Sequence, residues 1–158
     1  MIIKAIPTGE IQANCYIVMD ENTSEAVIID PGADEEIIYN LIENMKAKVK
    51  YILLTHGHFD HVWSNQEVKD KYNIKIYTPK DDNFMLVKDP YGLGMPPSTA
   101  DFLIEPDEEI ELEGIKIKFH HFPGHTPGCS AIQIDEHLFT GDFIFKGTIG
   151  RFDFPNSN

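Results

Sequence analysis

Residues 55–61, Thr-His-Gly-His-Phe-Asp-His, are the part of the sequence best suited to chemistry. Three of the seven histidines and one aspartate fall within six positions here: His56, His58, Asp60 and His61. Imidazole nitrogens and carboxylate oxygens bind zinc, iron or manganese, and no cysteine stands beside them to suggest a structural zinc site. The cluster therefore predicts a metal centre, with a solvated polar turn as the alternative.

The elements expected around this cluster suit a metal site. Residues 51–54 form an apolar run typical of a buried strand, and ligands of α/β sheets gather beyond the carboxyl ends of strands. Because His56 and His58 are two positions apart, an extended turn points both rings the same way. The glycine between them lets the backbone bend. The next two candidate ligands stand at the mouth of a helix expected over residues 62–72.

Two further polar residues follow apolar strands. His125 lies in residues 122–128, Phe-Pro-Gly-His-Thr-Pro-Gly, where two prolines and two glycines predict a loop of fixed shape. Asp142 ends the short apolar stretch that begins at Leu138. Alone, each would be interpreted as structural. Their recurrence at strand ends, beside three clustered histidines, favours metal ligands.

These motifs resemble those of the metallo-β-lactamase superfamily. The matching stretches are His-Gly-His-Phe-Asp-His, Pro-Gly-His-Thr, Gly-Asp and Asp-Pro-Gly, at residues 56–61, 123–126, 141–142 and 30–32. Within the superfamily the chain looks most like the small glyoxalase II-like (hydroxyacylglutathione hydrolase-like) hydrolases, whose pattern residues 145–155 resemble. The resemblance implies an α/β fold, the metallo-β-lactamase αββα sandwich, as one domain over residues 1–158.

The resemblance also marks a departure. Members of this group continue through further strands and helices that carry one more histidine ligand, whereas no histidine follows His137 here. We therefore expect the C-terminal part of the sandwich to be missing and the second metal site to lack one ligand. Strands that lose their cover would expose apolar surface, so we also expect a homo-oligomer.

The resemblance implies a ligand set and a mechanism. One metal would be held by His56, His58 and His125, and the second by Asp60 and His61. Asp142 would bridge the two metals. We expect zinc, with iron or manganese as alternatives, and assign Asp60 a catalytic role as well. A metal-bound water with a pKa lowered to about 7 gives the hydroxide that attacks a thioester or related ester. Lys146, Arg151 and Tyr91 are the expected substrate contacts, with a structural salt bridge as the alternative for Arg151.

Other functions remain open. The first alternative is an iron persulfide dioxygenase-like enzyme, in which His56, His125 and Asp142 would form a two-histidine, one-carboxylate triad. A lactonase shares the histidine motif. The last alternative is a truncated metal-binding domain without catalysis.

Composition restricts the partners. The net charge is −13, from thirteen basic and twenty-six acidic residues, which disfavours nucleic acid. No apolar run approaches the roughly 20 residues that span a bilayer, and residues 1–7 resemble a strand more than a signal peptide. We therefore expect a cytoplasmic protein that binds a small-molecule thioester or ester, without membrane partners. Cys15 and Cys129 define no disulfide framework and are interpreted as packing residues. For Cys129, which lies four residues after His125, a redox or ligand role is the alternative.

Apolar periodicity and turn residues predict the remaining elements. Strands are expected at residues 2–6, 15–19, 26–29, 49–55, 74–77, 108–112, 115–119, 130–134 and 137–140, and helices at 34–45, 62–72 and 79–87. Residues 89–98 show no periodicity and are interpreted either as a substrate-contacting flap or as a packed connector. His120 and His121 are interpreted as structural residues or as residues that contact the metal ligands without binding the metal.

Overall fold

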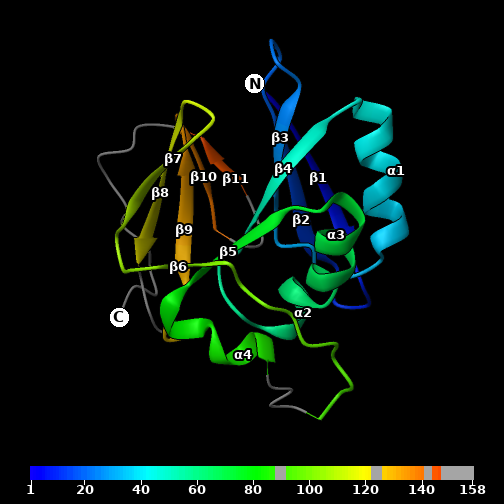
Figure 1. Ribbon diagram of the computed structural model, residues 1–158, viewed down its shortest axis with the longest axis vertical. Coiled ribbons are helices and arrows are strands. Elements are labelled where there is room, and N and C mark those ends of the chain that lie inside the picture. The colour runs from blue at the N-terminus through cyan, green and yellow to red at the C-terminus, as the bar shows by residue number, and fades with distance from the viewer. Residues whose placement is uncertain (88–91, 122–125, 141–143, 147–158) are drawn as a thin grey trace.

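A computed structural model describes residues 1–87, 92–121 and 126–140, together with the backbone of 144–146 (Figure 1). Two β-sheets face each other, and helices lie on the outer side of the first sheet (Figure 1). The described residues thus form three layers, helix, sheet and sheet, and the two expected sheets of the sandwich are confirmed. In the part of the chain that is described, no helix is long and apolar enough to cross a membrane.

The first sheet has six strands in the order β1-β2-β3-β4-β5-β6. They are β1 (Ile2–Thr8), β2 (Ala13–Met19), β3 (Glu25–Ile29), β4 (Lys48–Leu53), β5 (Lys75–Pro79) and β6 (Phe102–Ile104). The first three strands pair antiparallel, and β3 to β6 pair parallel. The carboxyl ends of β3, β4 and β5 therefore meet at one edge of the sheet, where ligand sites of α/β proteins lie.

The second sheet has five strands in the order β11-β10-β9-β8-β7. They are β7 (Glu109–Leu112), β8 (Ile115–His121), β9 (Ser130–Ile134), β10 (His137–Phe139) and β11 (Ile144–Lys146), and all neighbours pair antiparallel. The hairpin of β7 and β8 turns at Glu113-Gly114, where both residues have positive φ, 51° and 81°. Glycine adopts such a φ without steric cost. The strands expected at residues 108–112 and 115–119 are confirmed.

Two apolar cores hold these layers together. Ile38 and Ile42 of α1 (Glu35–Met45) and Val68 of α3 (Asn65–Tyr72) pack on one face of the first sheet. The other face packs on the second sheet, through residues such as Phe119 and Phe139, which are fully buried. Since the first sheet is covered on both faces, its central strands are apolar where they are buried, as at Ile52 and Leu53 of β4, whereas Lys48 and Lys50 at the start of β4 are exposed. Each buried isoleucine or phenylalanine stabilises the fold by about 1.5–3 kcal/mol.

The helix expected over 62–72 is in fact two helices. α2 (Phe59–Val62) ends before Ser64, and α3 follows. Ser64 has φ −93° and ψ 9°, and its N–H donates to the carbonyl oxygen of Pro31 at 3.0 Å in place of a helical acceptor. The buried Ser64 hydroxyl also donates to Glu35 at 3.0 Å. Contacts with another segment therefore break the helix, which periodicity does not reveal.

The helix expected over 79–87 is also wrong in extent. Pro79 is the last residue of β5 and pairs with Ile104 of β6. A 3-10 turn, η1 (Lys80–Asp82), follows, and then the short helix α4 (Phe84–Val87). Strand β6 was not predicted, because three residues are too few to show an alternating pattern.

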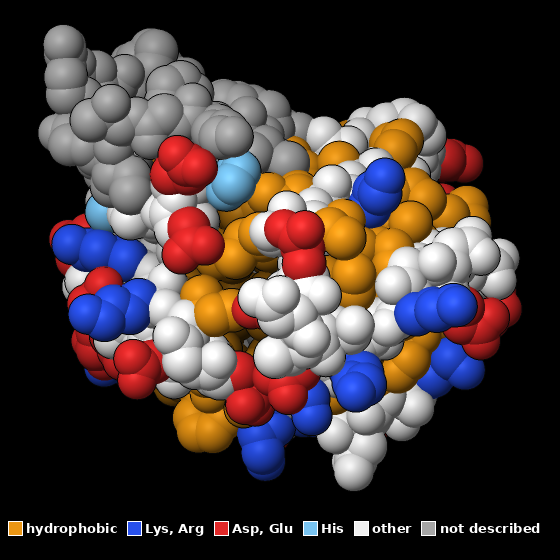
Figure 2. Space-filling view, turned by 90° about the horizontal axis from the view of Figure 1, so that it is seen from above, with side chains coloured by type: hydrophobic (Ala, Val, Ile, Leu, Met, Phe, Trp, Pro, Cys, Tyr) orange, Lys and Arg blue, Asp and Glu red, His pale blue; other side chains and the backbone are white. Residues whose placement is uncertain are grey.

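A shallow apolar groove lies at the opposite end of the sheets from the parallel strands' carboxyl ends. Tyr51, Leu112 and Ile115 line it. Figure 2 shows the molecule of Figure 1 from above. Hydrophobic side chains lie at the middle of this face, with charged side chains around them. This face carries no part of the histidine cluster, which follows the carboxyl end of β4.

Candidate metal centre

The centre is built where β3 and β4 end. Asp30 directly follows β3, and Thr55 and His56 follow β4 after one buried leucine. Because these strands are parallel neighbours, the residues beyond their carboxyl ends come together. Asp30 has φ 55°, a left-handed conformation that aspartate tolerates better than most residues. The sharp turn that it makes directs its carboxylate toward the end of β4.

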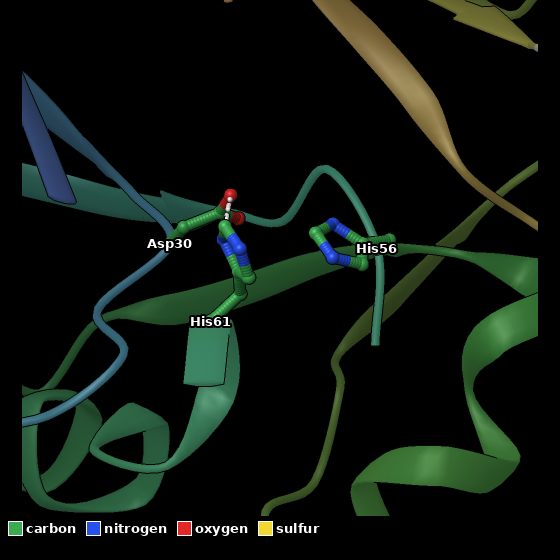
Figure 3. Close-up of side chains that lie close together, drawn as sticks. All are labelled: Asp30, His56 and His61. Carbon is green, nitrogen blue, oxygen red and sulfur yellow. Dashed lines mark hydrogen bonds and ion pairs between the residues drawn. The ribbon is translucent and has the colours of Figure 1, made fainter. Parts of the chain in front are cut away.

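Three hydrogen bonds converge on the Asp30 carboxylate. Oδ1 accepts from the Thr55 backbone N–H at 2.8 Å, and Oδ2 accepts from the Thr55 hydroxyl at 2.6 Å. The third is to His61, whose Nδ1 lies 2.9 Å from Oδ2 (Figure 3). All three residues are buried, with 3% or less of their surface exposed. The pairing of Asp30 with Nδ1 turns Nε2 of His61 away from Asp30, toward Asp60.

The imidazoles form a compact group. The ring centroids of His56 and His61 are 4.2 Å apart, and those of His56 and His58 are 5.1 Å apart. Nε2 of His61 lies 3.4 Å from Oδ2 of Asp60. The structure therefore brings together all four residues of the first motif that the sequence predicts as ligands.

Asp30, His56 and His61 are close enough to hold one metal ion, because one ligand atom from each lies within 4.8 Å of the others. Nδ1 of His56 is 2.8 Å from the Thr55 hydroxyl, so Nε2 is the ring nitrogen of both histidines that can act as a ligand. Histidine paired through its other nitrogen with a carboxylate is the usual arrangement around protein-bound metals. The donor set fits zinc or iron.

The role of Asp30 was missed by sequence reasoning, although its Asp-Pro-Gly motif was noted. Aspartate before Pro-Gly at a strand end also suits an ordinary turn. The available signal was that the strand before Asp30 and the strand before Thr55 could be parallel neighbours. Only the pairing of β3 with β4 shows that Asp30 reaches His61.

Gly32 fixes the packing of this turn against α2. A Cβ at Gly32 would lie 1.9 Å from the backbone oxygen of Asp60 and 3.1 Å from the Thr8 hydroxyl. Only glycine permits so close an approach of two backbones. The turn after β3 and the helix that carries Asp60 and His61 are therefore held in direct contact.

The other predicted site residues lie outside the described residues. These are two expected metal ligands and three expected substrate contacts, namely His125, Asp142, Tyr91, Arg151 and the side chain of Lys146. They stay predictions. Thr126, which follows His125 in the sequence, is described and buried. His121 contacts the adjoining loop, because its Nε2 lies 2.9 Å from the Pro127 carbonyl oxygen.

A cleft of about 490 Å³ adjoins the centre. Its lining combines the β1–β2 turn, the turn after β3, helix α2 and one residue of the long loop, specifically Thr8, Gly9, Glu10, Ile11, Gly32, Ala33, Phe59, Asp60, Trp63 and Leu93. The volume falls in the range of small-molecule sites. Asp60 belongs to both the cleft and the histidine cluster. Leu93 places the loop interpreted as a possible flap at the rim of this cleft.

The two cysteines lie in the interior of the fold. Cys15 and Cys129 are both buried and form no disulfide. Burial raises the pKa of the Cys15 thiol far above its usual range, and the nearby Asp30 charge raises it further. A thiolate, the form that binds metals, is therefore disfavoured at Cys15, as expected for a packing residue.

The chain is similar to several proteins of known sequence. Residues 8–158 match the family model of the "Metallo-beta-lactamase superfamily". Hydroxyacylglutathione hydrolase GloC of Haemophilus influenzae is 37% identical, and the aligned region covers all of this chain and 79% of the relative. "Probable metallo-hydrolase YqgX" of Bacillus subtilis is 32% identical over 164 residues, covering 98% of this chain and 77% of the relative.

Solved structures show the same fold. BLEG-1, a B3 metallo-beta-lactamase, superimposes with a TM-score of 0.83 at 30% identity and covers 98% of this chain and 78% of its own. TTHA1623, solved in a di-iron-bound form, superimposes with a TM-score of 0.74 at 30% identity, over 97% of this chain and 78% of its own. With its buried histidine–aspartate cluster, this chain is a metallo-hydrolase that belongs to the metallo-beta-lactamase superfamily.

Proposed function

We propose that this chain is a metal-dependent hydrolase that cleaves a hydroxyacyl-glutathione-like thioester or a related ester. The observation that carries the substrate class is the 37% identity to hydroxyacylglutathione hydrolase GloC over the whole chain. The observation that carries the chemistry is the pairing of Asp30 with His61 beside Asp60. Zinc is the proposed metal, with iron as the alternative, since a relative is known in a di-iron-bound form.

The residues of the centre present nitrogen and oxygen ligands in fixed orientations. Asp30 holds Nδ1 of His61, and the Thr55 hydroxyl faces Nδ1 of His56, so both rings offer Nε2. A bound zinc ion lowers the pKa of water to about 7 and so supplies a nucleophile at neutral pH. His125 and Asp142, by resemblance to the family, complete the ligand set. No side-chain nucleophile is required.

The cleft provides the binding site for the acyl group. Phe59, Trp63 and Leu93 give it apolar walls, and Asp60 stands where the cleft meets the histidines. A substrate whose apolar part occupies the cleft would bring its carbonyl carbon toward Asp60. This position supports the catalytic assignment of Asp60, whose oxygen is 3.4 Å from His61 Nε2. Lys146, Arg151 and Tyr91 remain the proposed contacts for the polar part of the substrate.

The test is turnover of lactoyl-glutathione by zinc-loaded protein, with His58→Ala and His137→Ala as a matched pair. His58 belongs to the imidazole cluster, whereas His137 begins β10 in the second sheet. We expect His58→Ala to lose both bound metal and turnover, and His137→Ala to retain both. A zinc-loaded wild-type chain that leaves lactoyl-glutathione intact would refute the thioester substrate.

A second candidate is hydrolysis of a β-lactam amide. The similarity to the BLEG-1 metallo-beta-lactamase, with a TM-score of 0.83 at 30% identity, favours it. The two candidates share the nucleophile and differ in the bond that is cleaved. Parallel assays with a chromogenic β-lactam and with lactoyl-glutathione separate them, and a glutathione persulfide assay under oxygen tests the dioxygenase alternative.

A further inference from the structure

Asp82, the last residue of η1, is a fully buried carboxylate outside the cluster described above. Burying a carboxylate is costly unless hydrogen bonds compensate for the lost water. Three groups donate to this one: the Gly57 backbone N–H at 2.9 Å, the Thr126 hydroxyl at 2.5 Å and the Gly128 backbone N–H at 2.7 Å. All three donors are neutral.

The donors come from two segments far apart in the sequence. Gly57 lies between His56 and His58, and Thr126 directly follows His125, the remaining histidine of the proposed ligand set. The Asp82 carboxylate thus accepts hydrogen bonds from the turn that carries His56 and His58 and from the loop that follows His125. A further backbone bond, from Ser130 N–H to the Thr55 carbonyl oxygen at 2.8 Å, joins the same two segments.

Both glycines are required by the closeness of this contact. A Cβ at Gly57 would lie 2.9 Å from the Asp82 backbone oxygen and 2.9 Å from Cβ of Met85. A Cβ at Gly128 would lie 3.0 Å from both the backbone nitrogen and Oδ1 of Asp82. The chain therefore packs two glycine-containing segments directly on η1, and the Asp82 carboxylate is the acceptor for both.

We propose that Asp82 is a positioning residue of the metal centre. Its carboxylate fixes the turn at Gly57 relative to the loop at Thr126–Gly128, and so sets how the flanking histidines meet a zinc ion. Partners of this kind, one shell beyond the ligands, change metal affinity when they are removed. The positioning role requires the metal centre of the proposed function, but not its thioester substrate.

The test is the zinc affinity of metal-free protein, titrated in competition with a chromogenic chelator, for wild type and Asp82→Asn. Asparagine keeps the size of the side chain but replaces one acceptor oxygen with an NH₂ donor. The Thr126 hydroxyl can reverse its hydrogen bond, whereas a backbone N–H cannot, so Gly57 or Gly128 loses its acceptor. We expect zinc to bind about 10- to 100-fold more weakly, and the visible absorption of the Co²⁺-loaded variant to change.

Asp81→Asn is the matched control, because Asp81 is adjacent in sequence and exposed. It should retain wild-type zinc affinity and Co²⁺ absorption. A folded Asp82→Asn variant with both properties unchanged would overturn the proposal, as would an equal loss in Asp81→Asn. If Asp82→Asn does not fold, Thr126→Val decides, because it removes only the hydroxyl bond: weaker zinc binding supports the role, and unchanged binding overturns it.

These outcomes separate the positioning role from the proposed function. Zinc binding that depends on Asp82, in a chain without activity on lactoyl-glutathione, would refute the thioester substrate and leave the role of Asp82 intact. Wild-type activity on lactoyl-glutathione, together with unchanged zinc affinity in Asp82→Asn, would support the thioester substrate and overturn the role of Asp82. A wild-type chain that binds no zinc would overturn both, and the first titration reveals it before any variant is made.

Discussion

Asp30→Asn is the substitution that tests the metal centre most directly. Asparagine is nearly the same size and tolerates the left-handed φ of 55° found here, so the backbone turn is preserved. The loss is confined to the carboxylate, whose two oxygens accept from Thr55 N–H, the Thr55 hydroxyl and His61. The variant therefore isolates the effect of the side-chain charge and of one acceptor.

The expected loss of stability follows from the three bonds to the Asp30 carboxylate, because the substitution removes the charge from both oxygens. A hydrogen bond to a charged group contributes about 1.5–3 kcal/mol, against about 0.5–1.5 kcal/mol for a neutral one. Replacing three charge-assisted bonds by neutral ones lowers the free energy of unfolding by roughly 3–4.5 kcal/mol. For a domain of this size, that corresponds to a fall in Tm of about 6–18 °C.

The substitution also changes which nitrogen of His61 carries the proton. Opposite a carboxylate, Nδ1 is the donor, which leaves Nε2 as the nitrogen that can bind a metal. Opposite an asparagine NH₂ group, Nδ1 must accept, and the proton moves to Nε2. A protonated Nε2 cannot bind a metal, so we expect zinc affinity to fall about 10- to 100-fold.

The assay pairs urea unfolding of the metal-free protein with zinc competition, for wild type, Asp30→Asn and Asp135→Asn. Asp135 is a matched control, because its φ is 53° and its side chain is exposed. Asp135→Asn should change neither property. Wild-type stability in Asp30→Asn would refute the hydrogen-bond reasoning. Lower stability with unchanged zinc affinity would refute the orientation of His61 through its tautomer.

Three further predictions test the packing and the electrostatics of the fold. Gly32→Ala should destabilise the fold by about 1–3 kcal/mol, because its Cβ would lie 1.9 Å from the Asp60 backbone oxygen. In the control Gly114→Ala, the new Cβ has nothing within 4 Å, so this variant should lose only the stability that corresponds to the strain of its positive φ. Equal losses of stability in urea unfolding would contradict this prediction. Cys15 and Cys129 are buried, so a thiol reagent should label neither in the native state and both in urea; rapid native labelling would show that the site opens. For Asp101, burial raises the pKa, but the Ile76 N–H and Lys69 outweigh it and leave the pKa below the ordinary 3.8. The folded state therefore binds a proton at Asp101 less readily than the unfolded state. The ionised Asp101 carboxylate stabilises the fold above about pH 3.8, and this stabilisation is lost as the pH falls through the depressed pKa. Wild type should lose more stability than Asp101→Asn between about pH 5 and pH 3, and parallel unfolding curves would contradict the depressed pKa.

The sequence alone determined the family, the first ligand motif and most strands, because these depend on local patterns. Three histidines within six positions identify a metal centre without knowledge of the fold. The buried end of β4 is evident from the continuous apolar residues 51–54. Hairpins such as β7–β8 are evident from alternation around a glycine turn. In each case the signal lies within a few consecutive residues.

Only the tertiary structure decided which residues hold that motif in place. Asp30 and His61 are 31 positions apart, and Asp82 is 44 positions from Thr126, so no periodicity connects them. The break at Ser64 has the same origin, since its N–H donates to Pro31 in another segment. A buried carboxylate and a turn-forming aspartate look alike in sequence. The hydrogen bonds that distinguish them form only once parallel strands bring distant segments to one edge of the sheet.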